Sequence, residues 1–73
     1  MGRKLSTYYA DLPENGYCEV HFDYKEEYAY IKYFDDNGKK FYTEEFKGKT
    51  IRYVEDAAEN WALGIKILEK SLN

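Results

Sequence analysis

The clearest pattern along the chain is an apolar stripe near its C-terminal end, with spacings of three and four residues. Such spacing places apolar side chains on one face of an α-helix, so the sequence predicts a helix over residues 51–71. Thr50 is the predicted N-cap, because its hydroxyl can accept a hydrogen bond from a backbone N–H of the first turn. Gly64 lies inside this predicted helix, where glycine costs about 1 kcal/mol relative to alanine. The stripe consists of Ile51, Val54, Ala58, Trp61, Ile65, Leu68 and Leu72.

Upstream of the stripe, polar and apolar residues alternate, which predicts an antiparallel sheet over residues 17–46. The runs 17–24 and 28–34 each alternate with a period of two, as half-buried strands do. Between the second run and the next lies Asn37-Gly38, a pair that favours a type I′ turn because both positions tolerate positive φ. The run 39–46 is therefore expected to return antiparallel to the run before it.

Two features of this sheet stay open. Phe41 and Phe46 have opposite parity, so either a β-bulge lies between them or one ring is exposed. Residues 5–12 are rich in strand formers, so residues 1–12 are predicted to form either an extra edge strand or an arm that covers the helix. The expected fold is α+β, a single small domain over 1–73 in which a three- or four-stranded antiparallel meander packs on one C-terminal α-helix.

Composition and charge narrow the class of protein. With 73 residues, 44% of them hydrophobic and 34% charged, the chain has the composition of a folded domain near the lower size limit for a single core. A lone Cys18 and the lack of an apolar run of signal-peptide or membrane-span length predict a cytoplasmic protein with no membrane association. The formal net charge of −3 opposes non-specific attraction to nucleic acid.

Candidate chemistry is sparse, and the sequence predicts no enzyme, no metal and no cofactor. Cys18 and His21 are the only thiolate or imidazole ligands, whereas a structural zinc site takes four such groups. On a strand these two side chains would also point to opposite faces, which removes the base that a cysteine nucleophile needs. His21 beside Glu19 or Asp23 could still act as a general base. This leaves a small hydrolase or ligand-binding protein centred on His21 as a third hypothesis.

The side of the sheet turned away from the helix is the main candidate binding surface. Tyrosines are enriched at protein interfaces, and rings carried on a sheet also stack on the bases of single-stranded nucleic acid. The acidic neighbours favour a protein partner, because nucleic-acid platforms surround their rings with Lys and Arg. Ordinary cross-strand pairing explains the tyrosines equally well. The predicted surface consists of Tyr17, Glu19, His21, Asp23, Tyr28, Tyr30, Lys32, Tyr42 and Glu44.

The predicted helix offers two further surfaces. Leu63 and Ile67 fall beside Asn60 on its polar side, so this helix edge is expected to be covered by a partner, by a second copy in a dimer, or by the N-terminal segment. The second surface is an acidic helix patch that could imitate the charge of a nucleic-acid backbone, although such a run is more often a solvated helix face. The patch consists of Glu55, Asp56 and Glu59.

In size and composition, and in no sequence motif, the chain is similar to the small proteins that phages encode to block host or anti-phage enzymes, including anti-CRISPR inhibitors. That resemblance implies an inhibitor of a nucleic-acid-processing partner. The leading hypothesis is therefore a non-enzymatic protein-interaction module that binds through the sheet surface or the helix edge. The alternative is a single-stranded nucleic-acid-binding domain that stacks bases on the same tyrosines. Its basic residues would be Lys32, Lys39, Lys40, Lys47, Lys49 and Arg52.

Overall fold

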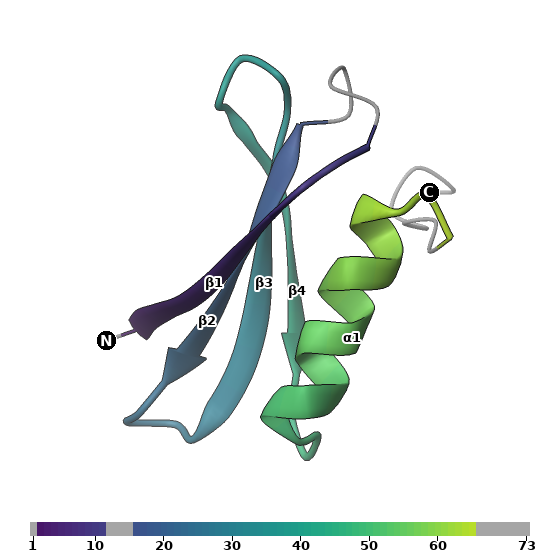
Figure 1. Cartoon of the computed structure of the whole chain (residues 1–73). Helices are drawn as coiled ribbons and strands as arrows, with labels where there is room; N and C mark the ends of the chain where they lie inside the picture. Colours follow the sequence, from purple (N-terminus) through teal and green to yellow (C-terminus); the bar gives the residue numbers. More distant parts are fainter. Residues whose placement is uncertain (1, 12–15, 66–73) are drawn as a thin grey trace, which may run out of the picture.

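The computed structural model describes residues 2–11 and 16–65, and in these ranges four strands precede one helix (Figure 1). The strands lie side by side in the order β1-β2-β3-β4, and each pairs antiparallel with the next. The α+β meander backed by a C-terminal helix is therefore confirmed, in its four-stranded form. The elements are β1 (Gly2–Tyr9), β2 (Tyr17–Asp23), β3 (Tyr28–Phe34), β4 (Lys40–Phe46) and α1 (Ile51–Ala62).

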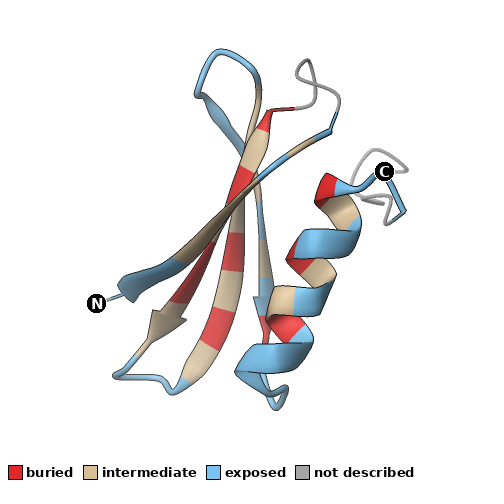
Figure 2. Ribbon diagram, in the orientation of Figure 1, coloured by how far each residue is buried: buried red, intermediate tan, exposed pale blue. Residues whose placement is uncertain are grey.

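Helix α1 lies along one face of the sheet, and the core is the layer between them. Figure 2 shows buried residues at alternate positions of the central strands and on the side of α1 turned toward the sheet. The predicted cap is present, because the Thr50 hydroxyl accepts a hydrogen bond from the Tyr53 N–H at 3.1 Å. Within the described ranges, no helix is long and apolar enough to span a membrane. The core consists of Cys18, Val20, Ala29, Ile31, Tyr33, Phe46, Val54 and Ala58.

Gly64 ends the helix, which corrects the predicted continuation through this position. Its φ of +83° lies in the left-handed region that favours glycine. The Gly64 N–H donates to the Trp61 carbonyl at 3.0 Å, and the Ile65 N–H donates to the Asn60 carbonyl at 2.8 Å, which is the Schellman pattern. Ile65, expected in the core stripe, is consequently exposed after the turn. The rest of the predicted helix, 66–71, lies outside the described residues.

A β-bulge in β4 resolves the conflict between its two phenylalanines. The pairing register between β3 and β4 shifts at Phe41, so Tyr42, Glu44 and Phe46 all point to the helix side. The predicted placement of Tyr42 and Glu44 on the opposite side is therefore wrong. The physical reason is that Phe46 packs in the core and Phe41 is the extra residue of the bulge, so that Phe41 is partly exposed.

The hairpin between β3 and β4 forms as predicted, but with a different turn. The Gly38 N–H donates to the Asp35 carbonyl at 3.0 Å and the Asp35 N–H donates to the Lys39 carbonyl at 2.9 Å, which closes a three-residue loop. Gly38 has a φ of +83°, whereas Asn37 is not among the described residues with positive φ. A type I′ turn needs positive φ at both centres, so the loop is a type I turn followed by a left-handed glycine.

The N-terminal segment is an edge strand of the sheet. Strand β1 pairs with β2 along its length, and a register shift between Lys4 and Ser6 leaves Leu5 as a bulge. Beyond β1, the Asp11 N–H donates to the Ala62 carbonyl at 2.9 Å. The start of the chain is thereby held both to the sheet and to the C-terminal end of α1.

Candidate binding surface

The face of the sheet turned away from α1, called here the outer face, carries most of the predicted surface. The pairing register brings its residues opposite one another in rows that run across the strands. Of the predicted residues it contains Tyr17, Glu19, His21, Asp23, Tyr28, Tyr30 and Lys32. The same register adds Lys4, Thr7 and Tyr9 from β1, Phe34 from β3, and Lys40, Thr43 and Glu45 from β4.

Three rings form an aromatic row at one end of the outer face. Tyr17 is opposite Tyr9 on one side and opposite Phe34 on the other. The rings of Tyr17 and Phe34 are stacked, with centroids 4.8 Å apart and an interplanar angle of 9°. Tyr9 and Tyr17 lie 5.5 Å apart with their planes tilted by 37°. Sequence reasoning left Tyr9 and Phe34 out of the surface, and the signal that could have found them is their expected pairing with Tyr17.

His21 occupies the middle of the outer face and is almost enclosed there. Its ring stacks on that of Tyr30 at 5.2 Å and 11°, and its Nε2 lies 2.9 Å from Glu19 Oε1. The side chain is 11% exposed. A general base must reach a substrate proton, so this packing favours a structural role over the hydrolase hypothesis.

Asp23, the other predicted partner of His21, is used by the loop after β2. Its Oδ1 accepts hydrogen bonds from the backbone N–H groups of Lys25 at 2.9 Å and Glu26 at 3.1 Å. The bond from Glu26 is the main cause that holds the pKa of the Asp23 carboxyl below its ordinary value. Asp23 therefore stabilises the turn after β2.

Lysines and carboxylates alternate around the rings of the outer face. Lys32 lies 5.9 Å from the centroid of the Tyr30 ring, and Lys47 lies 5.1 Å from that of Tyr28. The Tyr28 hydroxyl donates to Glu45 at 3.1 Å, which raises the pKa of Tyr28. Because Glu44 lies on the other face, the rings have neighbours of mixed charge, and the expectation of a mainly acidic surround is wrong.

Tyr42 and Glu44 belong to the core side of the sheet, where they pack with Tyr33. The Tyr33 hydroxyl donates to Glu44 Oε1 at 2.9 Å, and the rings of Tyr33 and Tyr42 lie 5.9 Å apart. Burial, with Glu44 as the second cause, raises the pKa of the Tyr33 hydroxyl. Trp61 of α1 closes this cluster with an edge-to-face contact to Tyr33 at 5.0 Å. These residues serve packing between sheet and helix.

The acidic helix patch is divided in the structure, which corrects its prediction as one surface. Glu55 points toward β1, where it accepts hydrogen bonds from the hydroxyls of Ser6 and Tyr8. The bond to Glu55 is the main cause that raises the pKa of Tyr8 to about 12. Asp56 and Glu59 remain exposed. A single acidic cluster that imitates a nucleic-acid backbone is therefore not present on the described part of α1.

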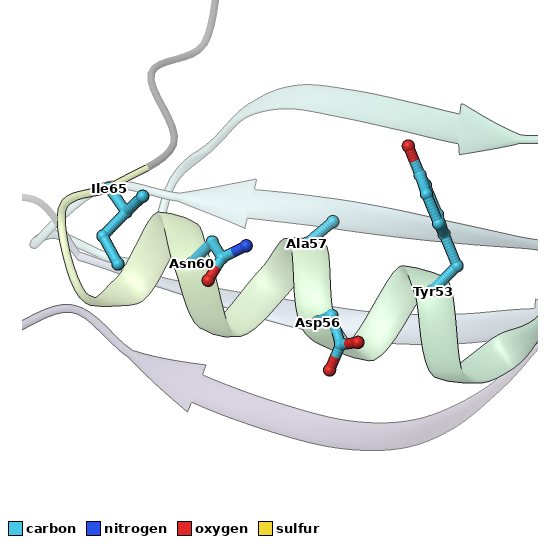
Figure 3. Close-up of a pocket in the computed structure, with 5 residues that line it drawn as sticks. All are labelled: Tyr53, Asp56, Ala57, Asn60 and Ile65. Atoms are coloured by element: carbon cyan, nitrogen blue, oxygen red, sulfur yellow. The ribbon is translucent and has the colours of Figure 1, made fainter.

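The helix edge is only partly described. Leu63 is the C-cap of α1 and is about half exposed, Asn60 is exposed, and Ile67 lies outside the described residues. A hollow of about 380 Å³ runs along the solvent side of α1 (Figure 3). Its lining consists of Tyr53, Asp56, Ala57, Asn60 and Ile65.

Cys18 is buried beneath α1, with its Sγ 4.0 Å from the Ala58 carbonyl. Burial raises the pKa of the Cys18 thiol to about 12, so the thiol is neutral at physiological pH. Among residues 2–11 and 16–65, no cluster of three or more His, Cys, Asp or Glu side chains could hold a metal ion.

No protein-family model, curated protein or solved structure matches the chain. The functional interpretation therefore rests on the geometry of the outer face and of α1.

Proposed function

We propose that the chain is a non-enzymatic protein-interaction module that binds its partner through the outer face. The observation that supports this most strongly is the set of cross-strand rings held on a sheet face that α1 does not cover. Rings fixed in stacks lose little conformational entropy when a partner docks, and tyrosines add hydroxyls that can hydrogen-bond to it. The surface is preorganised for contact with a folded protein.

The arrangement of the rings favours a protein over single-stranded nucleic acid. Base stacking needs the flat face of a ring to be open. The flat face of Tyr17 is stacked on Phe34, and that of Tyr30 is stacked on His21 with Lys32 near its ring. One flat face of each ring is thereby covered, and the tyrosine hydroxyl groups suit hydrogen bonding to the side chains of a protein partner. The lysines of the outer face are the observation that favours the nucleic-acid alternative, so the experiments test that alternative as well.

Charge bears on the kind of partner. The chain carries a net charge of −3, and its outer face mixes Lys4, Lys32 and Lys40 with Glu19 and Glu45. Mixed charges specify the register of a docked protein more than they supply affinity. A nucleic-acid-processing enzyme has basic surfaces that would attract an acidic inhibitor, which is the more specific form of this proposal.

The test is a photo-crosslinking experiment on the full chain in extracts of its native cells. The crosslinking residue p-benzoylphenylalanine replaces Thr43, which is exposed on the outer face, or Arg52, which is exposed on α1 and serves as the control. We expect a covalent protein adduct from position 43 and none from position 52. The adduct is identified, and the purified partner is titrated with the unmodified chain by calorimetry.

Variants then test whether the outer face carries the affinity. Thr43→Arg blocks the face without touching a ring stack, and Tyr30→Ala removes a ring, with circular dichroism used to confirm the fold. We expect each to weaken binding at least about tenfold, as hot-spot substitutions do. Tyr53→Ala, on the exposed side of α1, is the matched control and should bind normally. Equal affinity of both outer-face variants and the unmodified chain would exclude this face.

The nucleic-acid alternative is tested in parallel by fluorescence anisotropy with labelled single-stranded oligonucleotides at low salt. We expect no saturable binding. Saturable binding that falls steeply as salt is raised would instead identify backbone neutralisation by the lysines and replace the proposal.

A further inference from the structure

At the end of the aromatic row, a second hollow opens beside the turn between β3 and β4. Its volume is about 440 Å³, within the range of small-ligand pockets, ~300–1,000 Å³. Two tyrosines and one carboxylate line it, whereas the hollow along α1 has one tyrosine, Tyr53, and one carboxylate, Asp56. It is called here the Tyr9 hollow, and its lining consists of Tyr9, Ala10, Gly16, Tyr17 and Asp36.

The two rings form an open wedge. Tyr9 is 73% exposed, the largest exposed fraction among the exposed large hydrophobic residues of the described chain. Its plane is tilted by 37° from that of Tyr17, whose far side is stacked on Phe34. The Tyr9 ring therefore keeps a flat face available, whereas Tyr17 has a ring on each side. The face of a tyrosine ring carries negative electrostatic potential and attracts cations.

Asp36 brings a full negative charge to the same hollow. The turn holds its backbone in place, because Asp35 Oδ1 accepts hydrogen bonds from the N–H groups of Asn37 and Lys39, each at 2.9 Å. Among residues 2–11 and 16–65, no hydrogen bond or ion pair engages the Asp36 carboxylate. The hollow thus combines an exposed carboxylate, carried on a hydrogen-bonded turn, with ring faces, and no cation is among its described lining residues.

Other tyrosines of the chain have a lysine near the ring, whereas the described residues supply none at the Tyr9 hollow. Lys32, Lys47 and Lys49 lie 5.0–5.9 Å from the ring centroids of Tyr30, Tyr28 and Tyr53 respectively. No such internal contact is present for Tyr9 or Tyr17 in the described residues. Within the part of the chain that the structure describes, therefore, no cation complements these two rings.

We propose that the Tyr9 hollow receives a cationic side chain, arginine in preference to lysine, from the protein partner that docks on the outer face. This inference rests on the proposed function and names the chemistry of the partner. A guanidinium group is planar, so it can stack on the Tyr9 ring while its N–H groups pair with the Asp36 carboxylate. A phosphate would be repelled by the same carboxylate, so the hollow selects a basic protein segment against nucleic acid.

The first experiment needs no knowledge of the partner. The full chain, labelled with ¹⁵N, is titrated with acetyl-Gly-Arg-Gly-amide, with the matching lysine tripeptide, and with the citrulline tripeptide, which has the shape of arginine without its charge. We expect millimolar binding of the arginine peptide, on the order of what one exposed cation–π contact and one ion pair support. Amide shifts should centre on Tyr9, Tyr17 and Asp36, and the lysine peptide should bind more weakly.

Variants assign the binding to the hollow. Asp36→Asn and Tyr9→Leu should each weaken the arginine peptide about two- to fivefold. Asp56→Asn and Tyr53→Leu, which alter an exposed carboxylate and an exposed ring on α1, are the matched controls and should leave it unchanged. Equal binding of the citrulline peptide, shifts centred elsewhere, or no effect of Asp36→Asn would overturn the inference.

The second experiment separates this inference from the proposed function. With the crosslinked partner in hand, Asp36→Asn is combined with an Arg→Ala change at the partner residue nearest the hollow, in a double-mutant cycle. We expect the Arg→Ala change in the partner to weaken binding by less when Asp36→Asn is already present. Additive losses would overturn the inference while leaving the outer face as the interface. Unaltered binding by Thr43→Arg, together with tripeptide binding at the hollow, would instead defeat the proposed function alone.

Discussion

The hydroxyl of Tyr8 in β1 donates a hydrogen bond to Glu55 of α1, and the Ser6 hydroxyl donates to the second oxygen of the same carboxylate at 2.7 Å. One side chain of the helix thereby binds two residues of an edge strand that are far from it in sequence. Because β1 has a neighbouring strand on one side only, these bonds add to the few contacts that hold it against the helix side of the sheet.

Replacing Glu55 with Gln should lower the free energy of unfolding by about 1–2 kcal/mol, since hydrogen bonds to a charged acceptor are stronger than neutral ones. Urea unfolding followed by circular dichroism measures the change. Glu59→Gln, an exposed position one turn later, is the matched control and should change stability by less than about 0.5 kcal/mol. Similar losses in both variants would mean that the Glu55 contacts contribute nothing specific.

High pH should destabilise the chain, because Tyr28, which is exposed, and three more buried groups hold their protons more tightly when folded. The pKa of Tyr8 is raised from 10.0 to about 12, the pKa of Cys18 is raised from 9.0 to about 12, and that of Tyr33 is raised by burial. The unfolded chain loses these protons first as the pH rises. The stabilisation is therefore complete below about pH 9 and is lost progressively between pH 9 and 12.

Urea unfolding at a series of pH values from 8 to 11 measures this alkaline loss. Tyr8→Phe and Tyr33→Phe each remove a shifted hydroxyl, so each should make the decline with pH less steep. Tyr24→Phe alters an exposed ring and should leave the slope unchanged. A free energy of unfolding that stays level up to pH 11 would contradict the argument.

A side chain at Gly16 should be destabilising for two separate reasons. Its φ of +86° is unfavourable for other residues, and a Cβ there would lie 1.9 Å from the Phe34 carbonyl oxygen. Gly48 has a similar φ of +80° with nothing within 4 Å of its Cβ position. Gly48→Ala should therefore cost about 1–2 kcal/mol for the backbone conformation alone, and Gly16→Ala should cost more by at least about 1 kcal/mol.

Thermal unfolding of the two glycine variants measures this difference. Gly16 lies next to Tyr17, so its loss should also disturb the aromatic row, which near-ultraviolet circular dichroism reports. Equal stabilities of Gly16→Ala and Gly48→Ala would show that the backbone moves away from Phe34 at little cost.

The meander was predictable because the alternation of polar and apolar residues is a local signal. The prediction failed where that alternation was ambiguous. The parity of Phe41 and Phe46 predicts either a bulge or an exposed ring, and it does not say on which side of Tyr42 a bulge would lie. Only the pairing with β3 decides that, so the sides of Tyr42 and Glu44 could not be derived from the sequence.

The end of α1 was misjudged for a related reason. The apolar stripe runs on past Gly64 in the sequence, so periodicity favours a glycine inside a helix over a glycine that ends one. The role of Glu55 and the Tyr9 hollow depend on how β1 and the turn at Asp36 approach elements distant in sequence. Contacts of that kind have no periodicity to reveal them, although the pairing of Tyr9 with Tyr17 follows once β1 is accepted as a strand.

Glu27 offers a position at which one substitution should stabilise the chain. It is the one described residue other than glycine with positive φ, at 60°, and its N–H donates to the Asp23 carbonyl at 2.7 Å to close the loop between β2 and β3. Glycine adopts this conformation without a Cβ conflict, so Glu27→Gly should raise the free energy of unfolding by about 0.5–1 kcal/mol, net of the entropy that glycine adds to the unfolded chain. Glu26→Gly, at a neighbouring position with negative φ, has no strain to relieve and should give no gain. Chemical denaturation of both variants measures the contrast. A Glu27→Gly chain no more stable than the Glu26→Gly chain would show that the loop holds Glu27 without strain.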